Sequence, residues 1–222
     1  MRGGDGDPDV GDVVIHHYGA LHWSYAARGW MGFIAVQTDG RAVLRHELTF
    51  YKTTPDVAAT RIHAFLKAKG IPRLIDVIAQ PEIFPKTKTS RGETVSETFR
   101  ARGLHMTPGD KDRVNGWARI RAWLDVRTFR DDDREVPRIF DAPSLQVHAD
   151  CVYFLDTFLT LVSDAKQPDD IDSTTDEYPA AALRYWVMAR PLPPTKIVKT
   201  LPPDAIGHEI DAIRRGLRYA TR

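Results

Sequence analysis

The chain has 222 residues, of which 42% are hydrophobic, and this is enough to bury the core of one substantial domain. Its one cysteine, Cys151, excludes an internal disulfide framework, and no apolar stretch approaches the roughly 20 residues of a membrane span. The first residues lack the apolar core of a secretory signal, so we expect a soluble protein of a reducing compartment.

The net charge is +1, but opposite charges are segregated along the chain. Residues 84–138 hold 13 basic and 9 acidic residues, residues 181–222 hold 8 and 3, and the intervening residues 139–180 hold 1 and 9. Two basic segments around an acidic one are typical of a protein that meets phosphates with one surface and metal cations with another. Chance clustering on a solvated surface explains the pattern equally well.

The first third of the chain predicts three antiparallel strands and a helix. Alternating apolar residues and an Asp-Gly turn at Asp39 and Gly40 indicate strands at 13–23, 31–37 and 42–51. Thr54 is expected to cap a helix that has Pro55 at its first position and ends at Gly70. The apolar stripe of this helix consists of Ala58, Ile62, Phe65 and Leu66.

Strands and helices then alternate, which is typical of parallel crossovers. An apolar run at 73–80, stopped by Pro81, predicts a buried strand. The further predictions are a short helix through Phe99, a strand at 104–107, a helix at 113–124 capped by Asp112, and a strand at 144–147. We expect the charged segment 131–135 to be mobile.

Two more helices are predicted towards the C-terminus. Asp150 is expected to open one of them, with an inner face of Val152, Leu155, Leu159 and Val162. A proline-rich break at 191–194 precedes the other, whose apolar face consists of Ile206, Ile210, Ile213 and Leu217 and whose arginines face outward.

Several motifs along the chain resemble, in their order and spacing, those of one known family. Residues 172–185 join an acidic turn to a helix that reads Ala-Leu-Arg-Tyr, and residues 18–25, 79–81 and 108–117 precede them. Together these segments resemble the nuclease domain of phage terminase large subunits, the motors that package and cut viral DNA. The resemblance runs from about residue 18 to residue 188.

The resemblance implies an α/β fold of the ribonuclease H-like type, in which a mixed β-sheet of three antiparallel strands and then parallel strands is flanked by helices. The residue pattern alone leaves other α/β topologies open. We expect a disordered N-terminal tail at 1–12, the nuclease-like domain at 13–190, and a Pro-rich linker with a basic amphipathic helix at 191–222.

Nucleases of this family are understood to hold two divalent cations, Mg²⁺ or Mn²⁺, between clustered carboxylates. Three positions that match family acids carry His22, Gln80 and Ala181 instead, whereas Glu177 retains an acid. Magnesium binds carboxylate oxygens well and imidazole poorly, and two doubly charged ions cannot be held close together without anions. Cation binding is therefore doubtful, and the sequence leaves open whether the chain is an enzyme.

The remaining candidate metal ligands are Glu47, Asp176 and Glu177. Alternatively, Asp176 is a helix cap and Glu177 is an acid that stabilises the first helical turn. His22 can be a metal ligand, a base or a structural histidine that makes one hydrogen bond, and Gln80 is expected to tie the strand end to a loop. Arg184 is interpreted as a structural residue that pairs with a neighbouring acid.

Basic residues near the predicted site are candidates for phosphate contact with DNA, because short basic loops suit binding without base readout. These candidates are Lys86, Lys88, Arg91, Lys111 and Arg113. The sequence has no Gly-x-x-x-x-Gly-Lys-Ser/Thr loop, so the ATPase motor of a whole terminase is missing from it.

The preferred interpretation is a terminase nuclease domain, from a phage or prophage, with a degraded two-metal site and little or no endonuclease activity. The expected partners are double-stranded DNA and a phage portal or small terminase subunit, without a membrane, in the cytoplasm of a bacterial host cell. One alternative is an active endonuclease that uses Glu47, Asp176 and Glu177, with a contribution from His22. Another is a protein-interaction module that displays the basic C-terminal helix.

Overall fold

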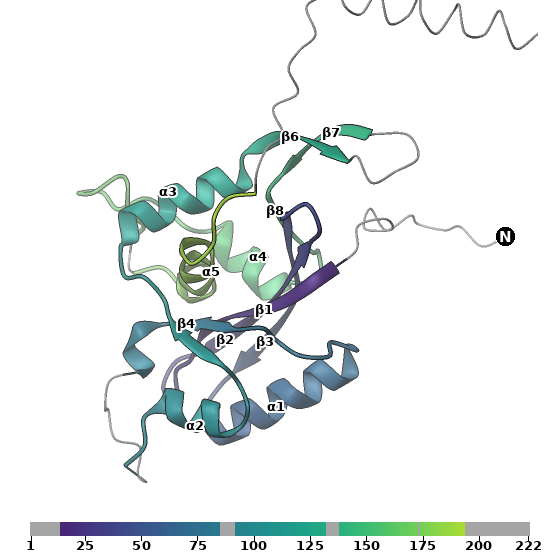
Figure 1. Cartoon of the computed structure of the whole chain (residues 1–222). Coiled ribbons are helices and arrows are strands. Elements are labelled where there is room, and N and C mark those ends of the chain that lie inside the picture. Colours follow the sequence, from purple (N-terminus) through teal and green to yellow (C-terminus); the bar gives the residue numbers. More distant parts are fainter. Residues whose placement is uncertain (1–13, 85–91, 132–137, 173, 194–222) are drawn as a thin grey trace, which may run out of the picture. The chain divides into compact units, whose positions relative to one another are not determined.

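The structure is a computed structural model that describes residues 14–84, 92–131, 138–172 and 174–193 (Figure 1). The expected N-terminal tail, the charged residues 132–135 and the last amphipathic helix lie outside these residues, so their predictions stay predictions. The described residues fall into two units, one with 14–127 and 142–193 and one with 128–141.

A six-stranded mixed sheet organises the first unit. Its strands are β1 (Val14–His22), β2 (Gly29–Gln37), β3 (Ala42–Phe50), β4 (Val77–Ala79), β5 (Met106–Pro108) and β8 (Leu145–Val147). They lie in the order β5-β4-β1-β2-β3-β8, with antiparallel pairing among β1, β2 and β3 and parallel pairing elsewhere. This confirms the ribonuclease H-like arrangement.

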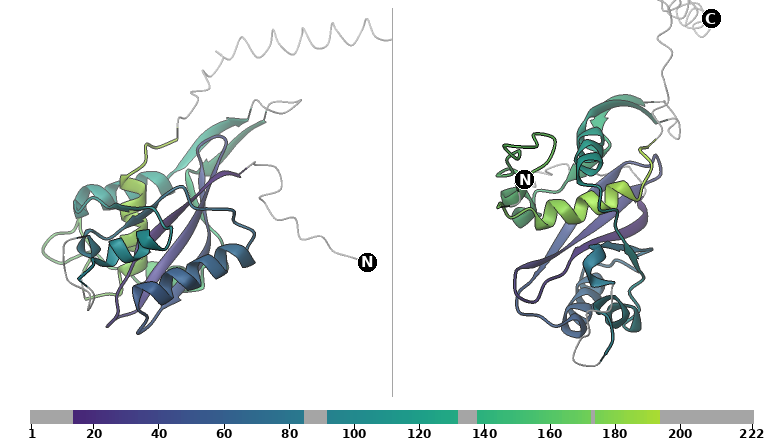
Figure 2. Two further views of the ribbon diagram at one scale, coloured as in Figure 1. Left: turned by 60° about the horizontal axis from the view of Figure 1, so that its bottom comes forward. Right: turned by 90° about the vertical axis from the view of Figure 1, so that its left-hand side faces the viewer.

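Helices cover both faces of the sheet (Figures 1 and 2). On one face lie α1 (Pro55–Ala68) and α2 (Val95–Ala101). On the other lie α3 (Arg113–Leu124), α4 (Val152–Phe158) and α5 (Tyr178–Met188). A short 3₁₀ helix, η1 (Pro81–Ile83), follows β4. Among the described residues, no helix is long and apolar enough to cross a membrane.

The central strands are buried on both faces because their apolar side chains alternate between two cores. Trp30 and Ile34 of β2 pack in the core that includes Trp186 of α5. Met31 and Phe33 of the same strand pack in the core that contains α1 and α2. Trp117, Trp123 and Trp186 are buried, and Trp23 is half-buried.

The start of α1 is where the sequence predicts it, and Thr54 is its N-cap residue, but the capping hydrogen bond is missing. Pro55 is the first residue of α1, whereas the side chain of Thr54 makes no capping hydrogen bond. A complete capping box occurs instead at α2, where the side chain of Thr94 accepts from the backbone of Glu97 and the Glu97 carboxylate accepts from the backbone of Thr94.

The predicted inner face of α4 is also wrong. Val152, Leu159 and Val162 are 57%, 79% and 53% exposed, and Phe154 is the buried residue of the helix. The helix is short, and Cys151 rather than Asp150 occupies its N-cap position. Hydrogen bonds to Glu47 of strand β3, which is distant in the sequence, anchor its first turn, and a local apolar pattern cannot reveal this contact.

A β-hairpin is formed by β6 (Val126–Asp131) and β7 (Arg138–Pro143), in a region that the sequence pattern predicts only as charged and mobile. The rings of Phe129 and Phe140 stack at a centroid separation of 6.0 Å. Their contribution is hard to detect in the sequence because arginines and aspartates surround them.

A buried arginine joins α5 to α3. Arg184 is 2% exposed, lies over the rings of Trp117 and Tyr185, and donates a hydrogen bond of 3.0 Å to the backbone carbonyl of Asp112. Its structural role is as predicted, although the partner is a carbonyl rather than a carboxylate. A Cβ atom at Gly116 of α3 would lie 2.5 Å from Cγ of Arg184, so the close approach of the two helices requires glycine here.

We predict that Gly116→Ala destabilises the protein by about 1–3 kcal/mol, because the added methyl group crowds a buried side chain. In an unobstructed helix the same change stabilises by about 0.8–1 kcal/mol. Urea unfolding measures the difference. The control is the same substitution in an Arg184→Ala background, where the penalty should disappear. An equal penalty in both backgrounds would contradict this explanation.

Candidate functional site

The candidate site lies where β1, β4 and α5 meet at one edge of the sheet. β1 and β4 are parallel neighbours that pair Leu21 with Ala79, so His22 and Gln80 directly follow paired residues. At the start of α5, Tyr178 stacks on His22 with ring centroids 4.3 Å apart and an interplanar angle of 16°. The fold thus brings the ends of β1 and β4 together with the first turns of α5.

Gln80 uses both ends of its amide within the protein. Its side-chain oxygen accepts a hydrogen bond of 2.5 Å from the backbone N–H of Trp23, and its Nε2 donates one of 2.6 Å to the Trp23 carbonyl. The residue is 7% exposed. The predicted tie between strand end and loop is confirmed. A carboxylate could make only half of this pair, since it cannot donate to a carbonyl.

His22 is a neutral residue at pH 7 because burial lowers the pKa of its imidazole to about 4. Nearby Glu82 and Asp176 act in the opposite direction, but loss of solvent dominates. Its Nδ1 atom is buried without a hydrogen-bond partner. The ring of Tyr178 stacks against this imidazole.

Ala181 lies in α5 and is 5% exposed. Its backbone N–H donates a helical hydrogen bond of 2.7 Å to the carbonyl of Glu177, and its methyl group belongs to the core shared with β1 and β2. The position contributes apolar packing and no ligand atom.

Glu47 of β3 is fully engaged by hydrogen-bond donors. Its carboxylate accepts from Nε1 of Trp30 at 2.8 Å and from the backbone N–H groups of Tyr153 and Phe154 at 2.7 and 3.0 Å. These two N–H groups belong to the first turn of α4, where an anion is favoured by the helix dipole. Glu47 therefore caps the first turn of a helix that is more than 100 positions away along the chain.

Glu177 is paired with Arg113 rather than free to bind a metal. Nη1 and Nη2 of Arg113 donate to the two oxygens of Glu177 at 2.6 and 3.0 Å. The hydrogen bonds that Arg113 donates to Glu177 and Asp170 raise its pKa above the ordinary value. Such a bidentate pair is among the strongest ionic contacts in proteins.

Asp170 also pairs with Arg113 and is the third charged residue of this group. It accepts from Nε of Arg113 at 2.8 Å and from Nε1 of Trp117 at 2.8 Å. Burial alone would raise its pKa, but the bonds from Arg113, Ile171 and Trp117 hold the pKa below its usual value. Asp170 is therefore an internally bonded acid rather than a solvated one. Nothing in the local sequence distinguishes it from Asp169 and Asp172.

Asp176 accepts a hydrogen bond from the hydroxyl of Tyr153, the same residue whose backbone N–H bonds to Glu47. Burial, followed by this bond, raises the pKa of Tyr153 above its ordinary value. The N-cap of α5 is Glu177, so the interpretation of Asp176 as that cap is wrong, and the side chain of Glu177 makes no capping bond either.

The three candidate metal ligands thus have separate partners: backbone and indole N–H groups for Glu47, a tyrosine for Asp176 and an arginine for Glu177. Within the described ranges, no three or more His, Cys, Asp or Glu residues are grouped so that they could hold a metal ion. The donor atoms at this edge do not fit the two divalent cations that the resemblance implies.

The predicted DNA contacts are only partly within the described residues. Lys111 forms an ion pair of 3.0 Å with Glu82, and both side chains are more than half exposed. Arg113 is held by Glu177 and Asp170, whereas Lys86, Lys88 and Arg91 lie outside the described residues. Lys111 is thus the described candidate whose charge faces solvent.

We predict that Glu47→Ala lowers the free energy of unfolding by about 2–4 kcal/mol, because it leaves three donors without their acceptor. Urea unfolding with and without Mg²⁺ measures this. The loss should be the same in both, since Glu47 serves a helix rather than a cation. Glu82→Ala is the control, and its exposed ion pair should contribute within about 1 kcal/mol. A loss that appears only with Mg²⁺ would assign Glu47 to a metal.

A second prediction concerns His22 and acid. The unfolded chain protonates this residue below its ordinary pKa of 6.5, whereas the folded chain does so only at a pKa of about 4. Acidification between these two values therefore favours the unfolded state, by roughly 3 kcal/mol over the whole window. Above 6.5 the contribution of His22 should be constant.

The measurement is the free energy of unfolding against pH for the native chain and for His22→Phe, which can stack on Tyr178 but cannot titrate. The stability of the native chain relative to the variant should decline as the pH falls through this window. A difference that is independent of pH would disprove the assignment.

No family model and no curated protein matches this chain by sequence. Among solved structures, the large terminase from a thermophilic bacteriophage is similar at a TM-score of 0.59 and 12% identity, covering 78% of this chain and 39% of the terminase. The same terminase in complex with ADP has a TM-score of 0.58, with 79% and 39% covered. The large terminase nuclease from thermophilic phage G20c, with bound cobalt, has a TM-score of 0.49 and 8% identity.

This chain matches about two fifths of the length of the first of these terminases. Similarity at 12% identity is informative about the backbone fold and not about the chemistry of individual positions. Over 78% of its length, this chain has the fold of a segment of a phage large terminase.

Proposed function

We propose that this chain is a terminase-like nuclease domain that has lost its two-metal centre and its endonuclease activity but retains the fold as a scaffold. The observation that carries the proposal is the donor chemistry of the sheet edge. His22, Gln80 and Ala181 stand where the resemblance places acids, and the amide of Gln80 is bonded at both ends to Trp23.

Electrostatics supports the loss of metal binding. Divalent ions of this kind are held by several carboxylate oxygens at about 2.0–2.6 Å. At this edge the carboxylate of Glu177 is already paired with the guanidinium of Arg113. A doubly charged ion about 5 Å from that guanidinium would be repelled by several kcal/mol at an effective dielectric constant of about 20. A cation would therefore have to displace Arg113 as well as find additional anions.

The alternative of an active nuclease built on Glu47, Asp176 and Glu177 requires more rearrangement. Glu47 would have to release the N–H groups of α4, and Glu177 would have to release Arg113. Each release leaves buried donors or an unpaired charge, which costs on the order of 1–3 kcal/mol or more. The geometry favours the non-catalytic scaffold over this alternative.

The retained role that we propose is contact with double-stranded DNA through phosphates, with a phage portal or a small terminase subunit as a further partner. Lys111 and the loop with Lys86, Lys88 and Arg91 supply the charge for such contact. Binding of this type carries no base readout and weakens as salt increases. Salt-sensitive DNA binding would argue against a module that only binds proteins.

We predict that the native chain does not cut plasmid DNA with Mg²⁺ or Mn²⁺, and that it releases no heat of Mn²⁺ binding in calorimetry. The restoring variant His22→Asp/Gln80→Asp/Ala181→Asp should bind Mn²⁺ measurably, because it returns three carboxylates to the edge. The matched control, His22→Asn/Gln80→Asn/Ala181→Asn, has similar side-chain size without the charge and should not bind.

Two outcomes would reject the proposal. One is robust cutting by the native chain that Glu177→Ala abolishes. The other is Mn²⁺ binding by the native chain that is equal to that of the restoring variant. Circular dichroism of each variant establishes that it is folded before the titrations are compared.

A further inference from the structure

A cavity of about 460 Å³ lies at the opposite end of the strands from the candidate site. Its lining comes from the end of α1, the loop before β4 and the turn before β5. His22 and Gln80, by contrast, lie at the C-terminal ends of β1 and β4. The cavity is therefore independent of the chemistry at the sheet edge.

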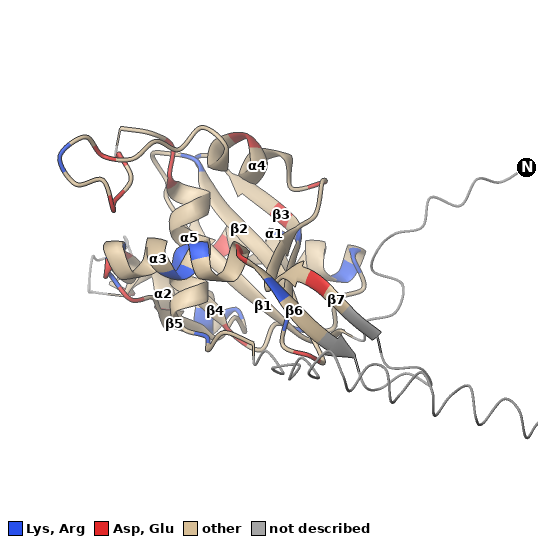
Figure 3. Cartoon of the chain, turned by 90° about the horizontal axis from the view of Figure 1, so that it is seen from above, with Lys and Arg blue, Asp and Glu red and all other residues tan. Residues whose placement is uncertain are grey.

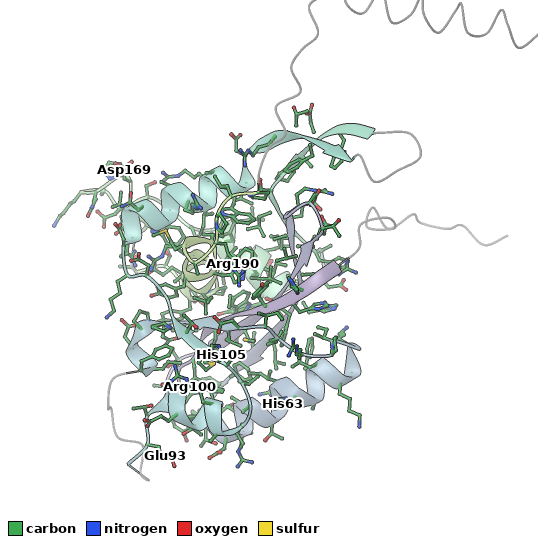
Figure 4. The ribbon with its side chains drawn as sticks, in the orientation of Figure 1. His63, Glu93, Arg100, His105, Asp169 and Arg190 are labelled. Atoms are coloured by element: carbon green, nitrogen blue, oxygen red, sulfur yellow. The ribbon has the colours of Figure 1, made fainter. Side chains whose placement is uncertain are left out.

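The polar part of the lining is basic. It contains His63, Lys67, Arg73 and His105 and no acidic residue, and Figure 4 labels His63 and His105. His63 contacts the carbonyl of Arg102 at 2.7 Å, and His105 contacts Asp76, which lies behind it, at 2.9 Å. Apolar walls are supplied by Leu66, Ile71, Pro72, Leu74 and Leu104.

Two of these basic groups have no internal counterion. Among the described residues, neither Lys67 nor Arg73 takes part in an ion pair, and both are exposed. A lysine and an arginine in the lining of one cavity, without a carboxylate in that lining, form a site that attracts anions.

A second, smaller cavity of about 160 Å³ extends the same basic surface. It shares Gly70 and Ile71 with the first cavity and is also lined by His17, Arg45, His46 and Lys69, again without an acid. Burial and the like charge of Arg45 lower the pKa of His17, and burial with the charges of Lys69 and Arg45 lowers the pKa of His46. The neighbouring groups thus experience a positive electrostatic potential.

Helix capping explains only part of this charge. Lys67 and Lys69 lie at the C-terminal end of α1, where the helix dipole favours cations, and Figure 3 colours the basic positions of α1 blue. Arg73 and His105, however, belong to connecting segments, and Arg45 and His46 belong to β3. Residues from α1, from β3 and from two connecting segments thus form one basic surface. The dipole of α1 alone does not account for it.

We propose that the larger cavity binds a ligand that carries clustered phosphates, with Lys67 and Arg73 contacting the phosphates and the apolar walls contacting the organic part. Its volume is in the range of small-molecule sites, about 300–1,000 Å³. Arginine suits the planar recognition of phosphate oxygens, and lysine adds a mobile point charge. The phosphates can come from a free nucleotide or from the end of a nucleic acid strand.

The test is calorimetric titration of the full chain with pyrophosphate, with ATP and with a short DNA duplex, each at low salt. Lys67→Gln/Arg73→Gln removes the two unpaired charges. Arg121→Gln/Lys166→Gln removes the same number of exposed charges elsewhere in the unit and is the matched control. All four positions are exposed, so we expect every variant to fold.

We expect the native chain to bind at least one of these probes, the Lys67/Arg73 variant to bind it at least about tenfold more weakly, and the control to remain within about twofold. If ATP binds more tightly than pyrophosphate, the apolar walls contact the organic part of the ligand. If only the duplex binds, and the Lys67/Arg73 variant binds it more weakly, the phosphates that the cavity recognises belong to nucleic acid. No binding of any probe, or equal weakening in the control, overturns the proposal.

Discussion

The pairing of each carboxylate at the sheet edge with an internal donor is the constraint on which the rest of the site depends. Glu47 holds the first turn of α4, and Glu177 holds Arg113, which in turn holds Asp170. In a metal centre these oxygens would be kept free for cations. Here they connect β3, α3, α4 and α5, so these acids have a structural role.

The sheet itself is stabilised by contacts away from these acids. The apolar residues of β1 and β2 are buried in two cores, one beneath α1 and α2 and one beneath α3, α4 and α5. Those cores do not depend on the residues at positions 22, 80 and 181, apart from the methyl group of Ala181. The two cores therefore do not require acids at these three positions.

Local sequence patterns predict the strands and helices that are stabilised by nearby residues of the chain. The strands β1, β2 and β3 follow from alternation and the Asp-Gly turn, and α1 follows from Pro55 and its apolar stripe. The pattern failed at α4, whose first turn is anchored by Glu47, and at the β6 and β7 hairpin, whose two phenylalanines are isolated among charges. In both cases the stabilising contact involves a residue that lies outside the local sequence pattern.

The sequence alone determined that His22, Gln80 and Ala181 stand at positions where the resemblance expects acids, because the identity of a residue needs no fold to be known. Only the tertiary structure decided what the remaining acids do. The partners of Glu177 and Glu47 are 64 and more than 100 positions away along the chain. Such pairs form only when packing of the sheet and helices brings distant segments within hydrogen-bonding distance, and no local pattern specifies them.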